Sequence, residues 1–403
     1  MKTHHPFSAE TPVLILGGKE NSLSVVRHLG GLGVPVSCSG AIGTWGLYSR
    51  LCDHRYVVPA GQAPADYWAN LLLGAGSPVE TGTVLFPCSD EALRFIAEHH
   101  DALARHFVFD EAPPEQRLAM LDKQRTLEIA REAGVDAPSF WSVNSDADLE
   151  KLRGKVAFPV MVKPIDSYRF AQTFHRKLFI IQSDFSELAE KVHLAWDKGH
   201  DVMVVEMVPG PDDLLSSYYT YMTGEGRPLF HFTKRVLRRY PVNSGGATFH
   251  LTEWLPETAD AGLRFFEGSG FRGLGNIEFK RDIRDGKLKV IEVNARFTAA
   301  QELALRAGMP IDLIKYCHLT GQSVPVVNGY REGLRYWYPV RDTLAFMELN
   351  ARGDLTFGAW LQSLKPDHNF VSPLHSKADL FPSVGAAYAV FQKAVGAWPG
   401  GSK

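Results

Sequence analysis

Short apolar runs alternate with helical spacing over the first part of the chain. Residues 13–16 form an apolar run that ends at Gly17-Gly18, and Asn21 or Ser22 can cap the helix that follows. Further short apolar runs precede the next helical stretch. This alternation of strands and helices predicts a parallel sheet with helices on both faces. The predicted strands are residues 13–16, 34–38 and 84–87, and the predicted helices end at Leu29 and run from about Asp90 to His99.

The pattern changes after a linker at Pro113-Pro114. Two strands joined by a turn are expected across residues 274–296, and the stretch from about Tyr330 is aromatic but carries no chemical motif. Together the two halves predict a chain that is part α/β and part α+β. Helices are predicted at 117–133 and 186–196, and strands at 158–162, 179–182 and 202–208.

The strongest chemical signal lies in the two strands 276–280 and 290–296. Alternate side chains of a strand share a face, so one face of this pair is apolar and the other is polar. Two carboxylates and an amide oxygen are ligands that Mg²⁺ accepts, and a neighbouring guanidinium can hold charge on a transferring phosphoryl group. The alternative is a half-exposed hairpin with a solvated charged face. The apolar face has Ile277, Phe279, Ile291, Val293 and Ala295, and the polar face has Glu278, Lys280, Glu292, Asn294 and Arg296.

The turn between these strands decides whether the two acids meet. A two-residue Asp-Gly loop would place Glu278 and Glu292 on different faces, with one carboxylate unpaired in the core. A three-residue loop, Arg284-Asp285-Gly286, places them directly opposite each other, with Gly286 in the left-handed region. We therefore predict that the two acids face each other and share a metal site.

Three further segments carry candidate ligand contacts. Lys163 ends an apolar strand, where a phosphate would satisfy its charge, although a lysine at a strand end can also reach water. The strand-to-turn segment 206–213 can offer backbone groups to an adenine and an acid to a ribose, or it is an ordinary Pro-Gly turn. The basic run 234–239 can line a phosphate site or be a solvated face. Strict alternation places Lys234, Val236 and Arg238 together.

Composition excludes several classes of protein. A formal net charge of −2 over 403 residues provides no basic field for nucleic acid, and the four cysteines form no CxxC pair. The N-terminus has no apolar signal-peptide region, and no apolar run is long enough to span a bilayer, so we expect a cytoplasmic protein. The first turn, GGKENS, fails the G-x-G-x-x-G fingerprint, which disfavours a nicotinamide oxidoreductase.

Taken in order, these segments resemble the ATP-grasp superfamily over nearly the whole chain. The resemblance rests on DK at Lys123, VKP at Lys163, EMVPGPDD at 206–213, KRVLRRYP at 234–241, IEFKRD and EVNAR. The opening LILGGKENSLSVVRHLGGLGVPV and FPCSD look like the preceding domain of its carboxylate–amine ligases, in particular the D-aspartate-ligase-like and uncharacterised branch. The resemblance implies a Rossmann-like domain at 1–118, a lid subdomain at 119–205, a metal-binding subdomain at 206–328 and an extension at 329–403.

The resemblance also implies residue roles and substrates. A carboxylate would be phosphorylated by ATP and coupled to an amine, with Mg²⁺ as cofactor and Mn²⁺ as a substitute. The partners would be small molecules, with no nucleic acid and no membrane span, and a homodimer is one expected assembly. Lys123 and Lys163 would contact phosphates, the Glu206 carbonyl and the Val208 amide would contact the adenine, and Asp213 would contact the ribose. Glu278, Glu292 and Asn294 would bind the metal. Arg296, Arg238 and Lys234 would stabilise the transferring phosphoryl group.

One segment departs from the family pattern. Many relatives carry a glycine-rich lid after the second lysine, whereas residues 166–177 contain no glycine. A glycine-free backbone cannot wrap phosphates in the same way, so Arg169, His175, Arg176 or Lys177 would substitute by side chain. Two alternatives share the ATP residues: a carboxylase that activates bicarbonate, and a non-catalytic ATP-binding protein.

Overall fold

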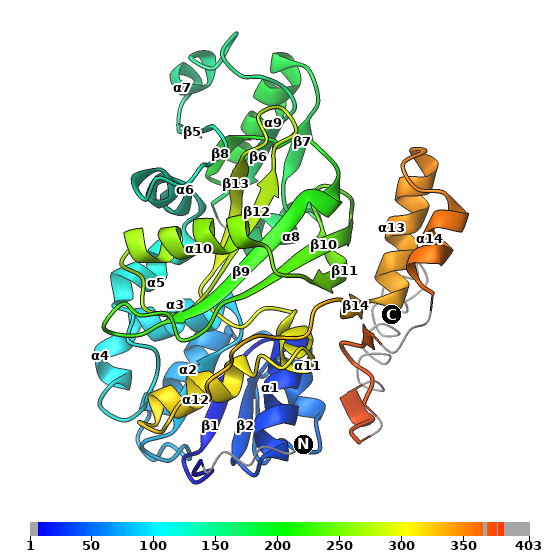
Figure 1. The fold of residues 1–403 in the computed structure, drawn as a ribbon. Coiled ribbons are helices and arrows are strands. Elements are labelled where there is room, and N and C mark those ends of the chain that lie inside the picture. The colour runs from blue at the N-terminus through cyan, green and yellow to red at the C-terminus, as the bar shows by residue number, and fades with distance from the viewer. Residues whose placement is uncertain (1–6, 166, 366–368, 377, 383–403) are drawn as a thin grey trace, which may run out of the picture.

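Three β-sheets organise the chain in the computed structural model, which describes residues 7–165, 167–365, 369–376 and 378–382 (Figure 1). The N-terminal sheet has the order β3-β2-β1-β4, and all of its strand pairs are parallel. Residues 13–16 and 84–87, which form its strands β1 and β4, are fully buried, as expected where helices cover both faces. The elements are β1 (Val13–Leu16), α1 (Glu20–Gly31), β2 (Val36–Gly40), the 3₁₀ turn η1 (Trp45–Tyr48), β3 (Arg55–Val57), α2 (Pro64–Leu73), β4 (Val84–Pro87), α3 (Asp90–Glu98) and α4 (His100–Leu103).

The prediction of a parallel-sheet domain is confirmed, but the predicted cap of its first helix is wrong. Helix α1 begins at Glu20, and Lys19 precedes it without a side-chain cap. The Asn21 amide instead donates to the Cys88 and Phe297 carbonyls, both at 2.8 Å. Asn21 therefore ties the N-terminal domain to the segment around Phe297.

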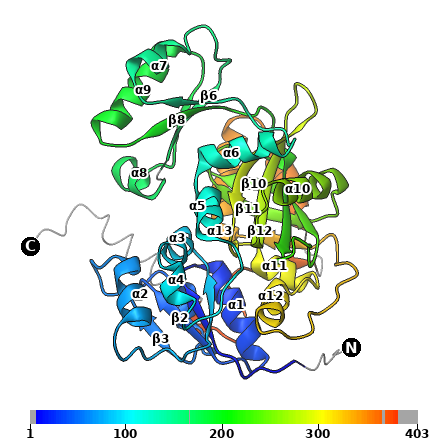
Figure 2. The same ribbon diagram turned by 90° about the vertical axis from the view of Figure 1, so that its left-hand side faces the viewer.

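A four-stranded antiparallel sheet, in the order β5-β8-β6-β7, forms the second unit. The predicted single helix over 117–133 is two helices, because Asp122 interrupts it and caps the second by accepting from the Gln124 and Arg125 amides. In Figure 2, α8 lies on the side of this sheet that is turned toward the N-terminal domain. The elements are α5 (Pro114–Leu121), α6 (Lys123–Glu132), β5 (Phe140–Val143), α7 (Asp146–Glu150), β6 (Val160–Pro164), α8 (Ser167–Phe174), β7 (Phe179–Ile181), α9 (Phe185–Asp197) and β8 (Val202–Glu206).

The third sheet is the largest, with the order β13-β12-β9-β10-β11-β14-β15. Strands β14 and β15 come from the predicted C-terminal extension and nevertheless join this sheet, while the domain boundaries themselves stay predictions. The elements are η2 (Asp212–Leu214), β9 (Leu215–Met222), β10 (Phe232–Tyr240), β11 (Gly246–Thr252), α10 (Pro256–Gly268), β12 (Gly273–Arg281), β13 (Leu288–Asn294), α11 (Gln301–Arg306), α12 (Ile311–Leu319), β14 (Arg335–Trp337), α13 (Pro339–Ala351), α14 (Phe357–Ser363) and β15 (Phe370–Val371).

The two faces of the third sheet pack against different partners. Tyr219, Phe232 and Leu274 share one buried cluster with the β1, β2 and α1 side chains of the N-terminal domain. Tyr218 and Ile277 belong to another cluster, with residues of α5, α6 and α10. We call the face that carries Tyr219, Phe232 and Leu274 the inner face. The polar row described next lies on this same face.

Candidate active site

Four polar side chains form a row across the inner face of the third sheet. Lys234 on β10 pairs in register with Ser217 on β9, Ser217 with Glu278 on β12, and Glu278 with Glu292 on β13. Residues that are opposite in a ladder share a face, so all four side chains lie on the same side as Tyr219. Lys234 is 2 % exposed, and its Nζ donates to the Ser217 Oγ at 3.0 Å.

The predicted meeting of Glu278 and Glu292 is confirmed, but the predicted three-residue loop is wrong. The Asp282 amide donates to the Lys287 carbonyl, so the loop has one residue more than predicted, and Gly286 has the expected positive φ of 73°. A bulge at Ile291 then shifts the register by one residue and brings the two acids opposite each other. For the same reason Val290, and not Ile291, belongs to the buried cluster with Phe279 and Val293.

The acidic pair has the properties of a cation site. Neither carboxylate has a hydrogen-bond donor among the described residues, and burial, with the neighbouring charge of Glu292, raises the pKa of Glu278. Asn294 lies beside them, and its amide nitrogen donates to the Asn276 Oδ1 at 3.3 Å. In the described part of the chain no three His, Cys, Asp or Glu side chains cluster as a metal site. Two acids and one amide therefore form the set that fits a magnesium ion, which also takes substrate phosphates and waters.

Arg296 lies two residues beyond Asn294 and reaches the N-terminal domain. Its Nε donates to the Asp90 Oδ1 at 2.5 Å, and its Nη1 donates to the Phe297 carbonyl at 3.2 Å. The Arg296 charge holds the pKa of Asp90 below its usual range. Asp90 begins α3, whose Ser89 cap accepts from the Ala92 amide. We did not predict this partner, although the segment FPCSD contains it.

Two lysines of the second unit face the row. The Lys123 Nζ donates to the Pro164 carbonyl at 3.2 Å, next to Lys163 on β6. Burial lowers the pKa of Lys163 to about 8; the Glu292 charge opposes this shift, and the charges of Lys123 and Arg239 reinforce it. Lys163 is therefore close enough to Glu292 and to Lys123 for their charges to act on it.

The basic strand β10 departs from the strict alternation that placed Arg238 with Lys234. The pairing with β11 is irregular between Val236 and Arg239, and Arg238 lies opposite Phe249, with its guanidinium 4.4 Å from the Phe249 ring centroid. Both Asp342 oxygens on α13 accept from Arg238 at 2.8 Å, so this arginine belongs to a buried ion pair on the other face. The prediction that Arg238 joins the phosphate site is therefore wrong.

Arg239 takes the place predicted for Arg238. Its charge acts on Lys163, Lys280 and Glu278, which places it near the row. Its Nε donates to the Asp212 Oδ1 at 2.7 Å. A bulge leaves no signature in a basic run, so alternation alone could not identify this residue.

In the segment after β8, the backbone groups that were predicted to contact a nucleotide are not used by other contacts. The Glu206 carboxylate accepts from the Ser139 amide at 2.9 Å and from the Arg284 Nη2 at 2.5 Å, so this side chain is engaged and only its carbonyl could serve a base. Among the described residues the Val208 amide has no hydrogen-bond partner. Asp213 in η2 is exposed, whereas Asp212 is buried by its pair with Arg239.

The glycine-free segment folds as α8 followed by a short connection to β7. Asp166 lies outside the described residues. Lys177 is exposed, and its charge acts on both Asp90 and Glu278. His175 has a positive φ of 53°, and the Arg176 guanidinium lies 5.7 Å from the Phe179 ring centroid. Of the four proposed substitutes for a glycine lid, Lys177 has the clearest electrostatic link to the site.

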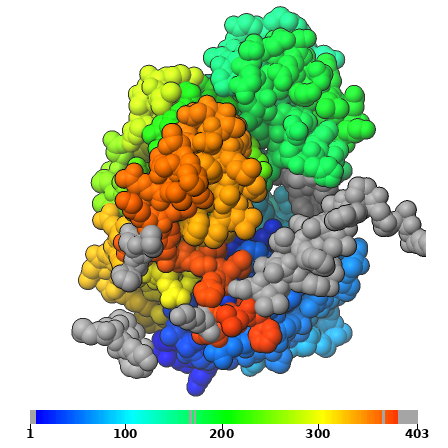
Figure 3. Space-filling model, turned by 90° about the vertical axis from the view of Figure 1, so that its right-hand side faces the viewer, coloured from blue at the N-terminus to red at the C-terminus, as the bar shows by residue number. Residues whose placement is uncertain are grey.

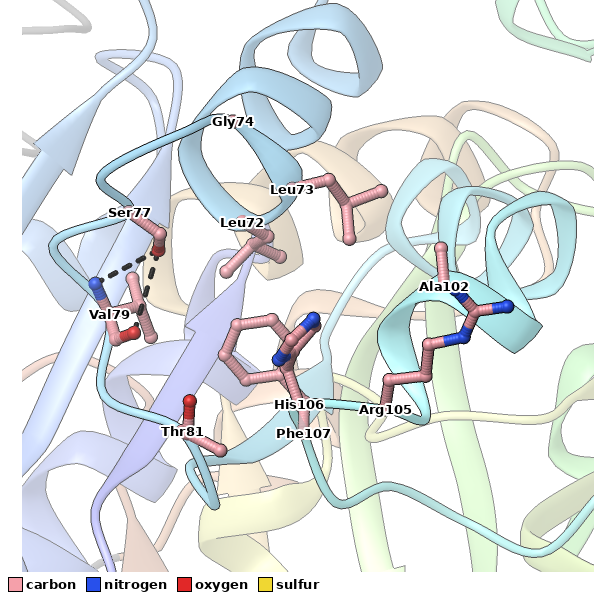
Figure 4. Close-up of a pocket in the computed structure, with 10 residues that line it drawn as sticks. All are labelled: Leu72, Leu73, Gly74, Ser77, Val79, Thr81, Ala102, Arg105, His106 and Phe107. Carbon is pink, nitrogen blue, oxygen red and sulfur yellow. Dashed lines mark hydrogen bonds between the residues drawn. The ribbon is translucent and has the colours of Figure 1, made fainter.

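A separate cavity of about 310 Å³ opens in the N-terminal domain (Figure 4). Its lining comes from the end of α2 with the loop after it, and from the residues around the end of α4. No residue of the polar row contributes to it, and its hydrogen bonds in Figure 4 join Ser77 to Val79. The cavity therefore plays no part in the site proposed here.

Comparison with known sequences gives distant relatives. No protein-family model matches the chain. D-aspartate ligase of Enterococcus faecium is 21% identical over 230 residues, which are 53% of this chain and 53% of that protein. Multifunctional protein ura1 of Schizosaccharomyces pombe is 27% identical over 169 residues, 40% of this chain and 7% of that protein. The chain thus matches about half the length of the first relative and a small part of the second.

Solved structures give a broader match. The biotin carboxylase domain of Hydrogenobacter thermophilus 2-oxoglutarate carboxylase, solved with MgADP and bicarbonate, is 15% identical with a TM-score of 0.62, and the match covers 82% of this chain and 74% of that one. L-amino acid ligase of Bacillus licheniformis is 17% identical with a TM-score of 0.58, and the match covers 77% of this chain and 74% of that one. The chain therefore shares its fold with these two enzymes.

Proposed function

We propose that the protein is an ATP-dependent ligase that phosphorylates a carboxylate and couples the acyl phosphate to an amine, releasing ADP and phosphate. The observation that carries the proposal is the pair Glu278 and Glu292, which face each other without hydrogen-bond donors among the described residues. Two such carboxylates repel unless a cation lies between them. A buried cation, Lys234, ends the same row, as a site for highly charged phosphates requires.

In this proposal Glu278, Glu292 and Asn294 hold Mg²⁺, which when bound supplies positive charge to the phosphates of ATP. Lys123 and Lys163 bind the α- and β-phosphates. The carbonyl of Glu206 and the free amide of Val208 read the adenine edge, and Asp213 accepts from ribose hydroxyls. Mn²⁺ is expected to substitute because it accepts the same oxygen ligands.

The remaining cations act on the group that is transferred. Arg296 holds negative charge on the phosphoryl group and on the acyl phosphate, and Asp90 fixes the orientation of its guanidinium. Lys234 adds charge from the other end of the row. The chain's contribution is positioning and charge neutralisation, since phosphate rather than oxide then leaves the carbonyl carbon when the amine attacks.

A carboxylase that activates bicarbonate is the second candidate, favoured by the biotin carboxylase domain among the structural neighbours. It would use the same ATP residues, so the substrate alone separates the two activities. Bicarbonate that stimulates ADP release without any other carboxylic acid would support the carboxylase. Failure of every acid to do so, while ATP still binds, would indicate a non-catalytic ATP-binding protein.

Product analysis tests the proposal directly. The protein is incubated with Mg²⁺, ATP and pairs of amino acids, and ADP, AMP and phosphate are separated. We expect ADP and phosphate, and hydroxylamine should trap the acyl phosphate as a hydroxamate. AMP with pyrophosphate would rule the mechanism out. Glu292→Gln, which removes one carboxylate of the pair, is the control that should yield neither product.

A further inference from the structure

The Glu206 carboxylate takes the place of a hydrogen bond that the strand ladder would otherwise contain. The Glu206 amide donates to the Ser139 carbonyl at 2.8 Å, one step beyond the paired strands β5 and β8. In a hydrogen-bonded antiparallel pair the two residues exchange both bonds, so the Ser139 amide would donate to the Glu206 carbonyl. It donates instead to the Glu206 Oε2 at 2.9 Å. The side chain of Glu206 therefore occupies the donor that its own carbonyl would use.

The Glu206 carbonyl does not turn toward the other neighbour of β8 either. Successive residues of a strand direct their backbone groups to opposite sides. On the side of β6 the Met207 amide donates to the Pro159 carbonyl at 3.2 Å. Glu206 therefore directs its amide and its carbonyl toward Ser139, and the carbonyl is left without the amide donor that a regular ladder would supply.

Arg284 holds the Glu206 carboxylate in this position. Its Nη2 donates to the Glu206 Oε1, which is the oxygen that the Ser139 amide does not use. The exposed fraction of the Glu206 side chain is 13%, so this carboxylate has lost most of its contact with water. A desolvated carboxylate needs a charged partner, and the guanidinium supplies it.

A buried acid orients Arg284 in turn. Both Asp282 oxygens accept from the Arg284 guanidinium, at 2.9 Å from Nε and 2.5 Å from Nη2. Asp282 also accepts from the Arg284 amide at 2.9 Å and from the Lys289 Nζ at 2.7 Å, and it is fully buried. A contact to both oxygens fixes the plane of the guanidinium. The turn between β12 and β13 therefore presents Arg284 to Glu206 in a defined orientation.

We propose that Arg284 is a positioning residue for base recognition, which acts through the Glu206 carboxylate to keep the Glu206 carbonyl free for the amino group of a purine. Adenine carries a donor at this position and guanine carries an acceptor, so a free carbonyl favours adenine and leaves guanine unpaired. The inference rests on the proposed function, in which this carbonyl reads the adenine edge. It adds the side chains that make the carbonyl available.

The test measures nucleotide binding without turnover. Titration calorimetry on the full chain gives the dissociation constants for the Mg²⁺ complexes of two non-hydrolysable analogues, one of ATP and one of GTP. The wild-type protein should prefer the adenine nucleotide. Arg284→Met should weaken binding of the ATP analogue about three- to tenfold, the equivalent of one hydrogen bond, without weakening binding of the GTP analogue.

Two further variants connect this loss to Glu206. Glu206→Ala leaves the contacts of Asp282 in place and should reduce the preference for adenine to the same extent. Arg281→Met is the matched control, because Arg281 borders the same turn, is 40% exposed against 43% for Arg284, and pairs with Glu257 instead. It should leave both dissociation constants unchanged.

A double variant separates a positioning role from a direct contact. If Arg284 acts only through Glu206, the double variant of Arg284→Met and Glu206→Ala should bind the ATP analogue no more weakly than Glu206→Ala alone. Arg284→Lys should restore part of the affinity, because a lysine can pair with Glu206 but cannot also keep the contact with both Asp282 oxygens.

Two outcomes would overturn the inference and leave the proposed function standing. One is a preference for adenine that is absent from the wild-type protein or is kept in Arg284→Met and Glu206→Ala, which would mean that the ion pair only joins the turn to β8. The other is additive losses in the double variant, which would mean that Arg284 contacts the nucleotide itself. A wild-type protein that binds neither nucleotide would instead count against the proposed function.

Discussion

Glu278 and Glu292 lie directly opposite each other although the register of their hairpin changes by one residue beside them. The bulge at Ile291 removes the consequence of the longer turn and keeps both carboxylates on the inner face. A regular ladder from this turn would have placed Ile291 opposite Glu278 and turned Glu292 to the other face.

Glu292→Gln should therefore abolish Mg²⁺-dependent turnover and leave the fold intact. In the metal-free protein it should not lower the melting temperature, because removing one charge relieves repulsion between the acids. Wild-type protein should gain about 2.7 kcal/mol of stability at a Mg²⁺–nucleotide concentration a hundred times the dissociation constant, and the variant should lose this gain. Glu267→Gln, an exposed acid on α10, is the control. Retained metal-dependent turnover in Glu292→Gln would contradict the metal assignment.

ATP binding should depend on pH through Lys163. Its pKa is lowered to about 8 in the folded protein, so the ammonium is lost as the pH rises through that value and ATP affinity should fall. Folding shows the opposite sign: the unfolded chain keeps this proton up to about 10.5, so the stability contribution of Lys163 rises with pH between 8 and 10.5. The dissociation constant for ATP, measured on both sides of pH 8, checks the first expectation.

Two variants separate Lys163 from other titrating groups. Lys163→Met should bind ATP weakly at every pH, and Lys163→Arg should keep its charge and lose the pH dependence. An unchanged affinity in Lys163→Met would mean that the lysine only reaches solvent from a strand end.

The neighbours Arg238 and Arg239 should give different phenotypes. Arg238→Met leaves the buried Asp342 carboxylate without its cation and should lower the free energy of unfolding by about 3–5 kcal/mol. The double variant with Asp342→Asn should lose less than the sum of the single losses, as measured by denaturant unfolding. Arg239→Gln also breaks the ion pair with Asp212, and it should in addition raise the KM for ATP. An Arg238→Met protein with normal stability and a raised KM for ATP would support the original prediction that Arg238 lies with Lys234.

Lys177 should contribute to nucleotide turnover without contributing to stability. It is exposed, and its charge acts on Glu278 and Asp90, so Lys177→Ala should lower kcat/KM for ATP by about tenfold while the melting temperature stays unchanged. Lys198→Ala, an exposed lysine that follows α9, is the matched control. Equal activity in the two variants would exclude Lys177 as a substitute for the glycine lid.

The sequence predicted the parts of the site that depend on local periodicity. The strand pattern of 276–280 and 290–296 led to the polar face, and the DK and VKP motifs led to Lys123 and Lys163. The sequence could not predict irregularities in strand pairing, because tertiary packing decides where a bulge forms. The core position of Val290 and the exchange of Arg238 for Arg239 both follow from bulges.

Contacts between distant segments were also outside its reach. Asp90 and Arg296 are far apart in the chain, and nothing in either motif indicates that they pair.

The ion pair of Arg238 and Asp342 has a practical consequence for anyone who shortens this protein. Asp342 also accepts from the Thr248 hydroxyl and from the Trp337 and Trp360 indoles, and the Arg238 Nη1 donates to the Ser363 Oγ, so α13 and α14 lie against the reverse side of β10. In Figure 3 the orange atoms of this part of the chain lie at the surface of the molecule. An expression boundary drawn before residue 339 would uncover a desolvated guanidinium and the Phe249 ring together. Such a fragment should be recovered as insoluble material rather than as an inactive enzyme, and a usable boundary has to lie beyond residue 363.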